Sequence, residues 1–376
     1  EIKEKIKNLY IHKKYEEVIE FTEKHTLPEE RPSGLINLVG NSFYLKKNPT
    51  KNDIFNALSL FEQAYLREKN SLHGLNGIKN YVIVGIKVSS VIKEFSEYLF
   101  KAKDLYIEAE NYFNQNEEFL QTGLLLFFHL LDKKKIKEII NKILNNSINS
   151  KDLRGQSTYM TNYFYDWPQE SISNISKKNS EYYSKLNVKQ IDKLAKLKNK
   201  IINLGFVSCD LIRNHSIYHF LKDTIKYLDK SKFRIFIFSL TRKDSNDLSQ
   251  NYLRELSDEW FDLQEFDNQK ISEIIQERNI EILFDLVGYT NSKRIEIFNS
   301  RMAPIQISWL AYCNTTGFDT VDYMLTDKNL IHEKEYNLYS EKIINLPNIW
   351  NTHSGFNYER KFNELKAFNK KFFTFG

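Results

Sequence analysis

The chain has 376 residues, which is more than one hydrophobic core usually fills, so two or three domains are expected. Its 54 basic and 49 acidic residues leave a formal net charge of +5 that is spread along the sequence, so charge gives no argument for a nucleic-acid partner. The first residues are charged, and the most apolar run, TGLLLFFHLL from Thr122, is about half of the roughly 20 residues that a membrane helix needs. That run predicts a buried helix, and no membrane insertion is expected.

The two cysteines, Cys209 and Cys313, are too few for a disulfide framework. Neither has a second sulfur or a histidine at metal-ligand spacing, so no metal site is predicted. Low cysteine use favours a reduced, cytoplasmic compartment.

Residues 1–150 have helical periodicity almost without interruption. In the segments KYEEVIEFTEKH, from Lys14, and IFNALSLFEQAY, from Ile54, apolar residues recur with a period near 3.6. Each predicted helix is apolar on one stripe only, so these helices have to pair and stack. The two segments resemble each other and a tetratricopeptide-type repeat, although their spacing exceeds the usual period of roughly 34 residues. An irregular helical bundle is the alternative.

The remainder of the chain divides into three further regions. Residues 151–199 are expected to be a helical connector, which ends in the charged segment KQIDKLAKLKNK. In residues 200–350, short apolar runs alternate with amphipathic helices, which predicts a Rossmann-like parallel sheet with helices on both faces. The predicted strands lie within residues 201–210, 233–240, 280–288, 305–312 and 322–327, and the predicted helices within 216–229 and 268–279.

Polar residues follow several of these strands, at the carboxyl edge where parallel sheets bind ligands. Glycine at positions 288 and 317 permits a positive φ or the close approach of a ligand to the backbone. The candidate site residues at the ends of the predicted strands within 201–210, 280–288 and 305–312, and in the segments that follow them, are Asp210, Asn214, His215, His219, Asp285, Tyr289, Thr290, Thr315, Thr316 and Gly317.

The residue types leave alternatives open at four of these positions. His215 is either a general base or an ordinary residue at a helix start, hydrogen-bonded to the backbone. His219 either lines the same cleft or packs in the core. Asp210 either takes part in the chemistry or caps the helix, and Asp285 either takes part or only terminates a strand. Since no G-x-G-x-x-G or P-loop pattern follows the first strand, neither a dinucleotide nor an NTPase site is supported.

Three segments in order carry a resemblance to a known family. They are GFVSCDLIRNHSIYHFL, DLVGYTNSKRIEIFNSRMAPIQISWLAYCNTTG and the pair VDYMLTDKNLI and YSEKIINLPNIW. Between about residues 204 and 350 they resemble the N-terminal catalytic lobe of the protein O-GlcNAc transferase family. The upstream helices fit as well, because that family carries tetratricopeptide repeats before its catalytic region.

The resemblance implies a metal-independent, inverting glycosyltransferase of the GT-B type, without a cofactor. Such an enzyme moves N-acetylglucosamine from UDP-GlcNAc to Ser or Thr of a protein acceptor, which the repeats help to hold. His215 matches the histidine of the family's Asn-His motif, so the resemblance implies that it acts as base or orients the acceptor hydroxyl. Tyr289, Thr290 and the NTTG turn match positions that shape the same cleft.

The sequence also departs from the family pattern. Ser216 stands where the family usually has proline, and Ala311 to Asn314 replace a Gly-Tyr-Pro-Gly turn. An aspartate considered as the base in animal members falls near Arg278, which cannot act as a base at neutral pH. If the reaction needs a carboxylate, Asp210 or Asp285 has to provide it.

The last segment, KAFNKKFFTFG, resembles the start of a second lobe, so residues 351–376 are expected to be the link to a lobe that is missing here. In the family that lobe carries most UDP contacts, including a lysine that neutralises the diphosphate, and the fragment alone is expected to be inactive. One alternative is a non-catalytic helical-repeat scaffold with a degenerate transferase lobe. Another is an unrelated enzyme that uses UDP-sugars to modify a lipid or small molecule.

Overall fold

The computed structural model describes residues 1–90, 96–145, 150–164, 167–183, 185–189, 191, 201–213, 215–353, 355 and 372. It divides into two compact units, Glu1–Tyr183 with Asn291–Lys293 and Ser184–Thr290 with Arg294–Gly376. The first unit is helical and the second contains a parallel sheet, which confirms the predicted fold class. Most of the charged segment at residues 189–200 and of the predicted link at 351–376 lies outside the described residues.

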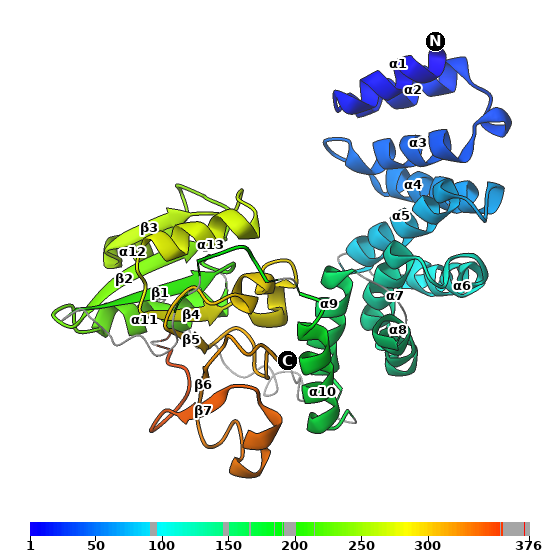
Figure 1. The fold of residues 1–376 in the computed structure, drawn as a ribbon. Coiled ribbons are helices and arrows are strands. Elements are labelled where there is room, and N and C mark those ends of the chain that lie inside the picture. Colours follow the sequence, from blue (N-terminus) through cyan, green and yellow to red (C-terminus); the bar gives the residue numbers. More distant parts are fainter. Residues whose placement is uncertain are drawn as a thin grey trace. The chain divides into compact units, whose positions relative to one another are not determined.

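The first unit is a series of helices joined by short connections (Figure 1). Both helices predicted from the repeated apolar pattern are present, as α2 and α4. The bounds are α1 (Ile2–Ile11), α2 (Tyr15–His25), η1 (Pro28–Glu30), α3 (Ser33–Leu45), α4 (Lys51–Arg67), α5 (Leu72–Ser89), α6 (Ser96–Phe113), α7 (Glu117–His129), α8 (Lys133–Asn145), α9 (Lys151–Thr161) and α10 (Gln169–Ser180).

The helices stack as they do in solenoid proteins. Neighbouring helices pack in pairs, and the alternate helices α1, α3, α5 and α7 also contact one another in turn. Ion pairs between successive hairpins join Lys69 to Glu108 and Lys79 to Glu118, in each case across 39 residues. These ion pairs link helices that are far apart in the sequence, and the stacking lets the helices bury their apolar stripes against one another.

The predicted buried helix is α7. Leu124, Leu126 and Phe127 in this helix are buried, and the ring of Phe119 stacks on Tyr106 of α6 with a centroid distance of 4.0 Å. Within the described part of the chain, no helix is long and apolar enough to cross a membrane.

The second unit is built on a seven-stranded sheet with the order β3-β2-β1-β4-β5-β6-β7, and all six strand pairings are parallel. The five predicted strands are confirmed as β1, β2, β4, β5 and β6, whereas the short strands β3 and β7 were not predicted. The bounds are β1 (Ile202–Ser208), β2 (Phe233–Ser239), β3 (Glu259–Asp262), β4 (Ile282–Leu286), β5 (Ile305–Ser308), β6 (Tyr323–Thr326) and β7 (Lys342–Asn345).

Helices cover the two faces of this sheet, as expected. On one face, α11 (Ser216–Tyr227) and α12 (Leu248–Leu256) pack over the buried side chains of Phe206 and Ile237. The next connection leads from β3, at one edge of the sheet, back past β2 and β1 to β4. Because crossovers between parallel strands are right-handed, this connection places α13 (Asn268–Glu277) on the other face. The connections after β4 and β6 contain the 3₁₀ helices η3 (Gly288–Asn291), η4 (Ile295–Asn299) and η5 (Glu333–Leu338).

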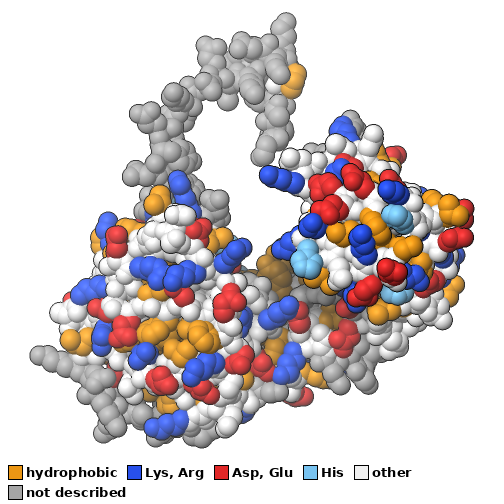
Figure 2. Space-filling view, turned by 90° about the horizontal axis from the view of Figure 1, so that it is seen from above, with side chains coloured by type: hydrophobic (Ala, Val, Ile, Leu, Met, Phe, Trp, Pro, Cys, Tyr) orange, Lys and Arg blue, Asp and Glu red, His pale blue; other side chains and the backbone are white. Residues whose placement is uncertain are grey.

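The surface charge is mixed in sign. In Figure 2, basic and acidic side chains are interspersed over the visible face of both units. This agrees with the even distribution of charge along the sequence.

Both glycines singled out in the sequence have a positive φ, +53° for Gly288 and +79° for Gly317. Gly288 also has no room for a side chain, because a Cβ atom would lie 2.2 Å from Cβ of Tyr312. The turn after β4 therefore requires glycine for two independent reasons.

We predict that Gly288→Ala lowers the free energy of unfolding by about 2–4 kcal/mol, the sum of a left-handed non-glycine residue and an overpacked contact. Chemical denaturation monitored by circular dichroism measures the change. Gly85→Ala is the matched control, because this glycine lies inside α5 and a Cβ atom added there would meet no neighbouring atom within 4 Å. It should raise stability by about 0.5–1 kcal/mol. Equal effects of the two variants would contradict this account.

Candidate active site

The candidate site lies where the sheet order reverses. From β1 the chain proceeds through β2 to β3 on one side, and it resumes with β4 on the other side of β1. Ser208, which ends β1, is in register with Leu286, which ends β4. The loops that follow these strands thus begin side by side and diverge, which is where open α/β sheets bind ligands.

His215 connects the loop after β1 to α11. It is the N-cap residue of this helix, and its Nδ1 accepts a hydrogen bond of 3.4 Å from the main-chain N–H of Ile217. Its Nε2 lies 3.8 Å from Oδ1 of Asp210, and the two side chains are 40% and 27% exposed. The hydrogen bond to the backbone that the sequence suggested as one alternative for His215 is therefore present. It uses Nδ1, so Nε2 remains beside the carboxyl group of Asp210.

Asp210 does not cap the helix, since His215 occupies that position. Its main-chain N–H donates to Oγ of Ser208 at 3.1 Å, a bond that does not involve the carboxyl group. Partial burial raises the pKa of the Asp210 carboxyl above its usual range, and a charge on His215 opposes this shift. A carboxyl group of raised pKa within reach of solvent is a candidate proton acceptor.

His219 lies one turn along α11 and anchors two segments. Its Nε2 donates to the main-chain oxygen of Arg213 at 2.8 Å. Its ring stacks on His353, with a centroid distance of 5.3 Å and an interplanar angle of 27°. Burial lowers the pKa of His219. Asn214, predicted to bind substrate, lies outside the described residues.

Asp285 is 1% exposed and shapes the loop after β4. Its Oδ1 accepts hydrogen bonds from the N–H groups of Val287, at 2.8 Å, and Gly288, at 3.0 Å. Its Oδ2 is buried without a hydrogen-bond partner among the described residues. Burial raises the pKa of Asp285 to about 6; the two amides oppose this shift and the charge of Glu341 adds to it.

The predicted residues of the NTTG turn are held by Glu341, a buried residue just before β7. Its carboxylate accepts hydrogen bonds from Oγ1 of Thr315, at 2.7 Å, from the N–H of Thr316, at 2.8 Å, and from Oγ1 of Thr316. The buried Tyr289 joins this network, because its hydroxyl donates to the main-chain oxygen of Thr316 at 2.9 Å. Sequence reasoning missed Glu341, since a Glu-Lys pair before a short strand is typical of an exposed position.

Two other predicted residues complete the description of these loops. Gly317 donates its N–H to Oγ1 of Thr315 at 3.2 Å, so it belongs to the same buried turn. Thr290 is exposed, and its hydroxyl donates to the main-chain oxygen of Val287. The structure thus brings Asp210 and His215 together, and it places Tyr289, Thr315 and Thr316 in the buried wall behind the loops.

The segment after β7 returns across the carboxyl edge of the sheet. The main-chain N–H of Trp350 donates to Oδ2 of Asp327, at the end of β6, with a distance of 2.9 Å. Its carbonyl accepts from Nε1 of Trp309, just after β5, at 2.8 Å. Three residues later, His353 stacks on His219. This segment therefore spans from β7 back to α11, a connection that no short-range sequence pattern revealed.

Among the residues that the structure describes, no group of three His, Cys, Asp or Glu side chains could hold a metal ion. Within the same residues, neither Cys209 nor Cys313 forms a disulfide bond.

The fold and these loops define a Rossmann-like α/β lobe preceded by stacked helices. Residues 128–366 match the sequence model of Glycosyl transferase family 41. The chain belongs to this family, which confirms the resemblance to O-GlcNAc transferases.

The similar proteins agree with this assignment. A probable UDP-N-acetylglucosamine–peptide N-acetylglucosaminyltransferase SEC of Arabidopsis thaliana is 29% identical over 151 residues, which are 40% of this chain and 15% of that protein. A SPINDLY protein of Petunia hybrida with the same description is 27% identical over 176 residues, 46% of this chain and 19% of its own length. The chain thus spans less than a fifth of these curated relatives.

A solved structure shares the fold. The O-GlcNAc transferase of Thermobaculum terrenum, as a mutant, superposes with a TM-score of 0.60 at 19% identity, over 80% of this chain and 55% of that one. At this identity the likeness supports the arrangement of helices and sheet.

Asp285 predicts a distinctive pH dependence. Its pKa is about 6 in the folded chain and about 3.9 when unfolded, so between these values the folded chain binds more protons. The contribution of Asp285 to the free energy of unfolding therefore falls as pH rises, by about 2 kcal/mol between pH 4 and 7. Asp285→Asn keeps an acceptor oxygen but cannot ionise, and it should remove this fall. Urea unfolding at four pH values measures it.

The contrasting variant is Asp327→Asn. Three main-chain N–H groups, of Trp350, Asn329 and Leu330, lower the pKa of Asp327, so its contribution is present above the unfolded pKa and lost as pH falls. Removing it should change the pH dependence in the opposite sense to Asp285→Asn. Variants that shift the whole curve in parallel would show that neither carboxyl group titrates differently on unfolding.

Proposed function

We propose that this chain forms the helical repeats and acceptor-side lobe of a protein O-glycosyltransferase. The enzyme would transfer a sugar from a UDP-sugar to Ser or Thr of a protein, with inversion at the sugar carbon. The family supports a glycosyl transfer. The printed descriptions of the plant relatives, which name UDP-N-acetylglucosamine and a peptide, support the donor and acceptor classes.

The observation that carries the proposal is the pair Asp210 and His215 at the reversal point of the sheet. A Ser or Thr hydroxyl is a weak nucleophile near neutral pH. A positioned base activates it by taking its proton, and a hydrogen-bond donor can fix its orientation. Both side chains are partly exposed, so an acceptor can reach them from solvent. In this proposal His215 contacts the acceptor hydroxyl, and most UDP contacts belong to a second lobe.

The helical unit would hold the protein acceptor. Stacked helical repeats present extended surfaces that bind other chains. Binding the acceptor in this way would use residues of the helical unit, and it would leave the residues of the sheet unit available for the reaction.

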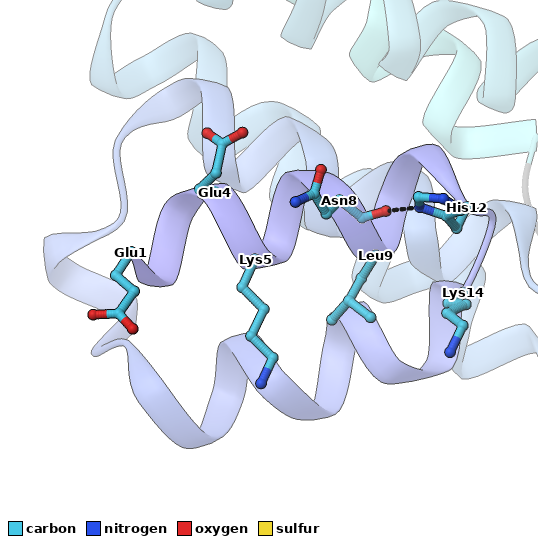
Figure 3. Close-up of a pocket in the computed structure, with 7 residues that line it drawn as sticks. All are labelled: Glu1, Glu4, Lys5, Asn8, Leu9, His12 and Lys14. Atoms are coloured by element: carbon cyan, nitrogen blue, oxygen red, sulfur yellow. Dashed lines mark hydrogen bonds between the residues drawn. The ribbon is translucent and has the colours of Figure 1, made fainter.

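A second candidate function, partner binding by a non-catalytic scaffold, has one observation in its favour. A groove of about 560 Å³ runs along α1, lined by one apolar side chain and several charged ones (Figure 3). In the close-up, Leu9 and Lys5 extend toward the neighbouring helix, while Glu4 and Asn8 point away from it. Such a groove suits a protein partner better than a nucleotide, and partner binding without any sugar transfer would favour the scaffold.

We predict that His215→Ala in the full-length protein lowers sugar transfer at least about 100-fold, the size of effect expected when a group that contacts and positions the reacting hydroxyl is lost. The fold should survive, since a lost helix cap costs about 0.5–2 kcal/mol. Transfer of labelled sugar from UDP-sugars to protein measures the effect, with thermal unfolding beside it. His332→Ala, an exposed histidine of the same unit, is the control and should retain activity. Undiminished transfer by the His215 variant would refute its role.

A further inference from the structure

We propose that Asp210 takes the proton of the acceptor hydroxyl and that His215 acts as a hydrogen-bond donor to the same oxygen. The inference rests on the proposed function. The family resemblance assigns either role, base or orienting group, to His215, whereas here the two roles belong to two different residues. Four features of the site support it.

The first is the hydrogen bond at the start of α11. The N–H of Ile217 donates to Nδ1 of His215, so this nitrogen presents its lone pair to the backbone. A neutral imidazole has one N–H and one lone pair, and its proton must then reside on Nε2. The nitrogen that faces Asp210 is consequently a donor, and accepting a substrate proton there would require a change of tautomer and the loss of the cap.

The second is the distance between the two groups. Nε2 of His215 and Oδ1 of Asp210 are 3.8 Å apart, which is too far for a direct hydrogen bond. An oxygen placed about 2.8 Å from each atom fits beside this gap, since two such bonds span up to about 5.6 Å. One hydroxyl can therefore accept from Nε2–H and donate to the carboxylate at the same time.

The third is the environment of Asp210. Its side chain is 27% exposed, so substrate can touch it, yet partial burial raises its pKa. A carboxylate of raised pKa is a stronger base than an ordinary aspartate, and it is closer to the range that is useful near neutral pH.

The fourth is the position of the other groups considered. Oδ2 of Asp285 is buried, and its Oδ1 is engaged by two main-chain N–H groups, so this carboxylate cannot touch an acceptor. Nε of Arg278 lies 3.7 Å from Oε2 of Glu259, and this guanidinium carries a permanent charge. Asp210 and Asp285 are the two carboxyl groups that the sequence suggested as a base, and Asp210 is the one that an acceptor can reach.

The reaction step balances in this assignment. The hydroxyl oxygen forms a bond to the anomeric carbon of the sugar, and the bond from that carbon to the diphosphate oxygen breaks. UDP leaves with the electron pair of that bond, and the hydroxyl proton moves to Asp210. His215 begins and ends the step neutral, with its proton on Nε2, and it orients the attacking oxygen throughout.

Two substitutions of His215 separate the roles by activity. The side-chain amide of His215→Gln can still donate from the place of Nε2, whereas His215→Phe keeps an aromatic ring and cannot donate. We expect the Gln variant to retain kcat within about tenfold of wild type and the Phe variant to lose at least about 100-fold. If His215 is the base, the two variants lose activity equally, and that result would overturn the inference.

Asp210→Asn supplies the complementary test in the full-length protein. It should lower kcat at least about 100-fold with little change in KM, because the amide can still accept a hydrogen bond but cannot accept the proton. Asp244→Asn, an exposed aspartate on the loop after β2, is the matched control and should behave as wild type. Full activity of Asp210→Asn would refute its role as base. Unfolding curves of each variant show whether a loss reflects misfolding.

A measurement without turnover distinguishes failure of this inference from failure of the proposed function. Histidine side-chain ¹⁵N NMR of the chain at pH 7.5, with His215→Gln to assign the signals, reports which ring nitrogen bears the proton. Protonated Nε2 is expected, and a proton on Nδ1 would overturn the inference whether or not the protein transfers sugar. Absence of transfer from any UDP-sugar by the wild-type protein would instead count against the proposed function.

Discussion

The loop after β4, at the carboxyl edge of the sheet, depends on the buried carboxylate of Asp285, which accepts hydrogen bonds from the main chain of that loop. Asp285 binds the N–H groups of Val287 and Gly288, and the turn that results has the left-handed geometry that only glycine adopts at little cost. Gly288 then lies against Tyr312, and Tyr289 reaches the turn at Thr316. Burying a charge is costly unless hydrogen bonds compensate, so this loop can vary little without loss of stability.

Sequence patterns predicted the strands and helices that are determined by residues close to one another in the chain. β1, β2 and β4 read as continuous apolar runs because both of their faces are buried, and α11 reads as a helix because one stripe is apolar. β3 and β7 were missed for the opposite reason. Each has four residues, and β7, at the edge of the sheet, is largely exposed, so neither has a long apolar run.

Contacts between distant residues account for the rest. Glu341 is bound by Thr315 and Thr316, about 25 residues earlier in the chain, and nothing near Glu341 indicates that it is buried. The departure at Ser216 is easier to explain. It is the first residue of α11, where proline is favoured because the N–H there has no partner within the helix, so serine can replace it while His215 remains the cap.

The segment around Trp350 has a consequence for whatever follows it in the chain. Both main-chain groups of Trp350 are bonded at the carboxyl edge, and His353 stacks on His219 beside the site. Residue 353 therefore lies beside the site, and a group joined to the chain after it would be tethered there. The entropy cost of closing the chain between this point and such a group would grow only slowly with the number of residues between them. The two hydrogen bonds of the Trp350 backbone thus fix the point on this lobe from which that tether begins.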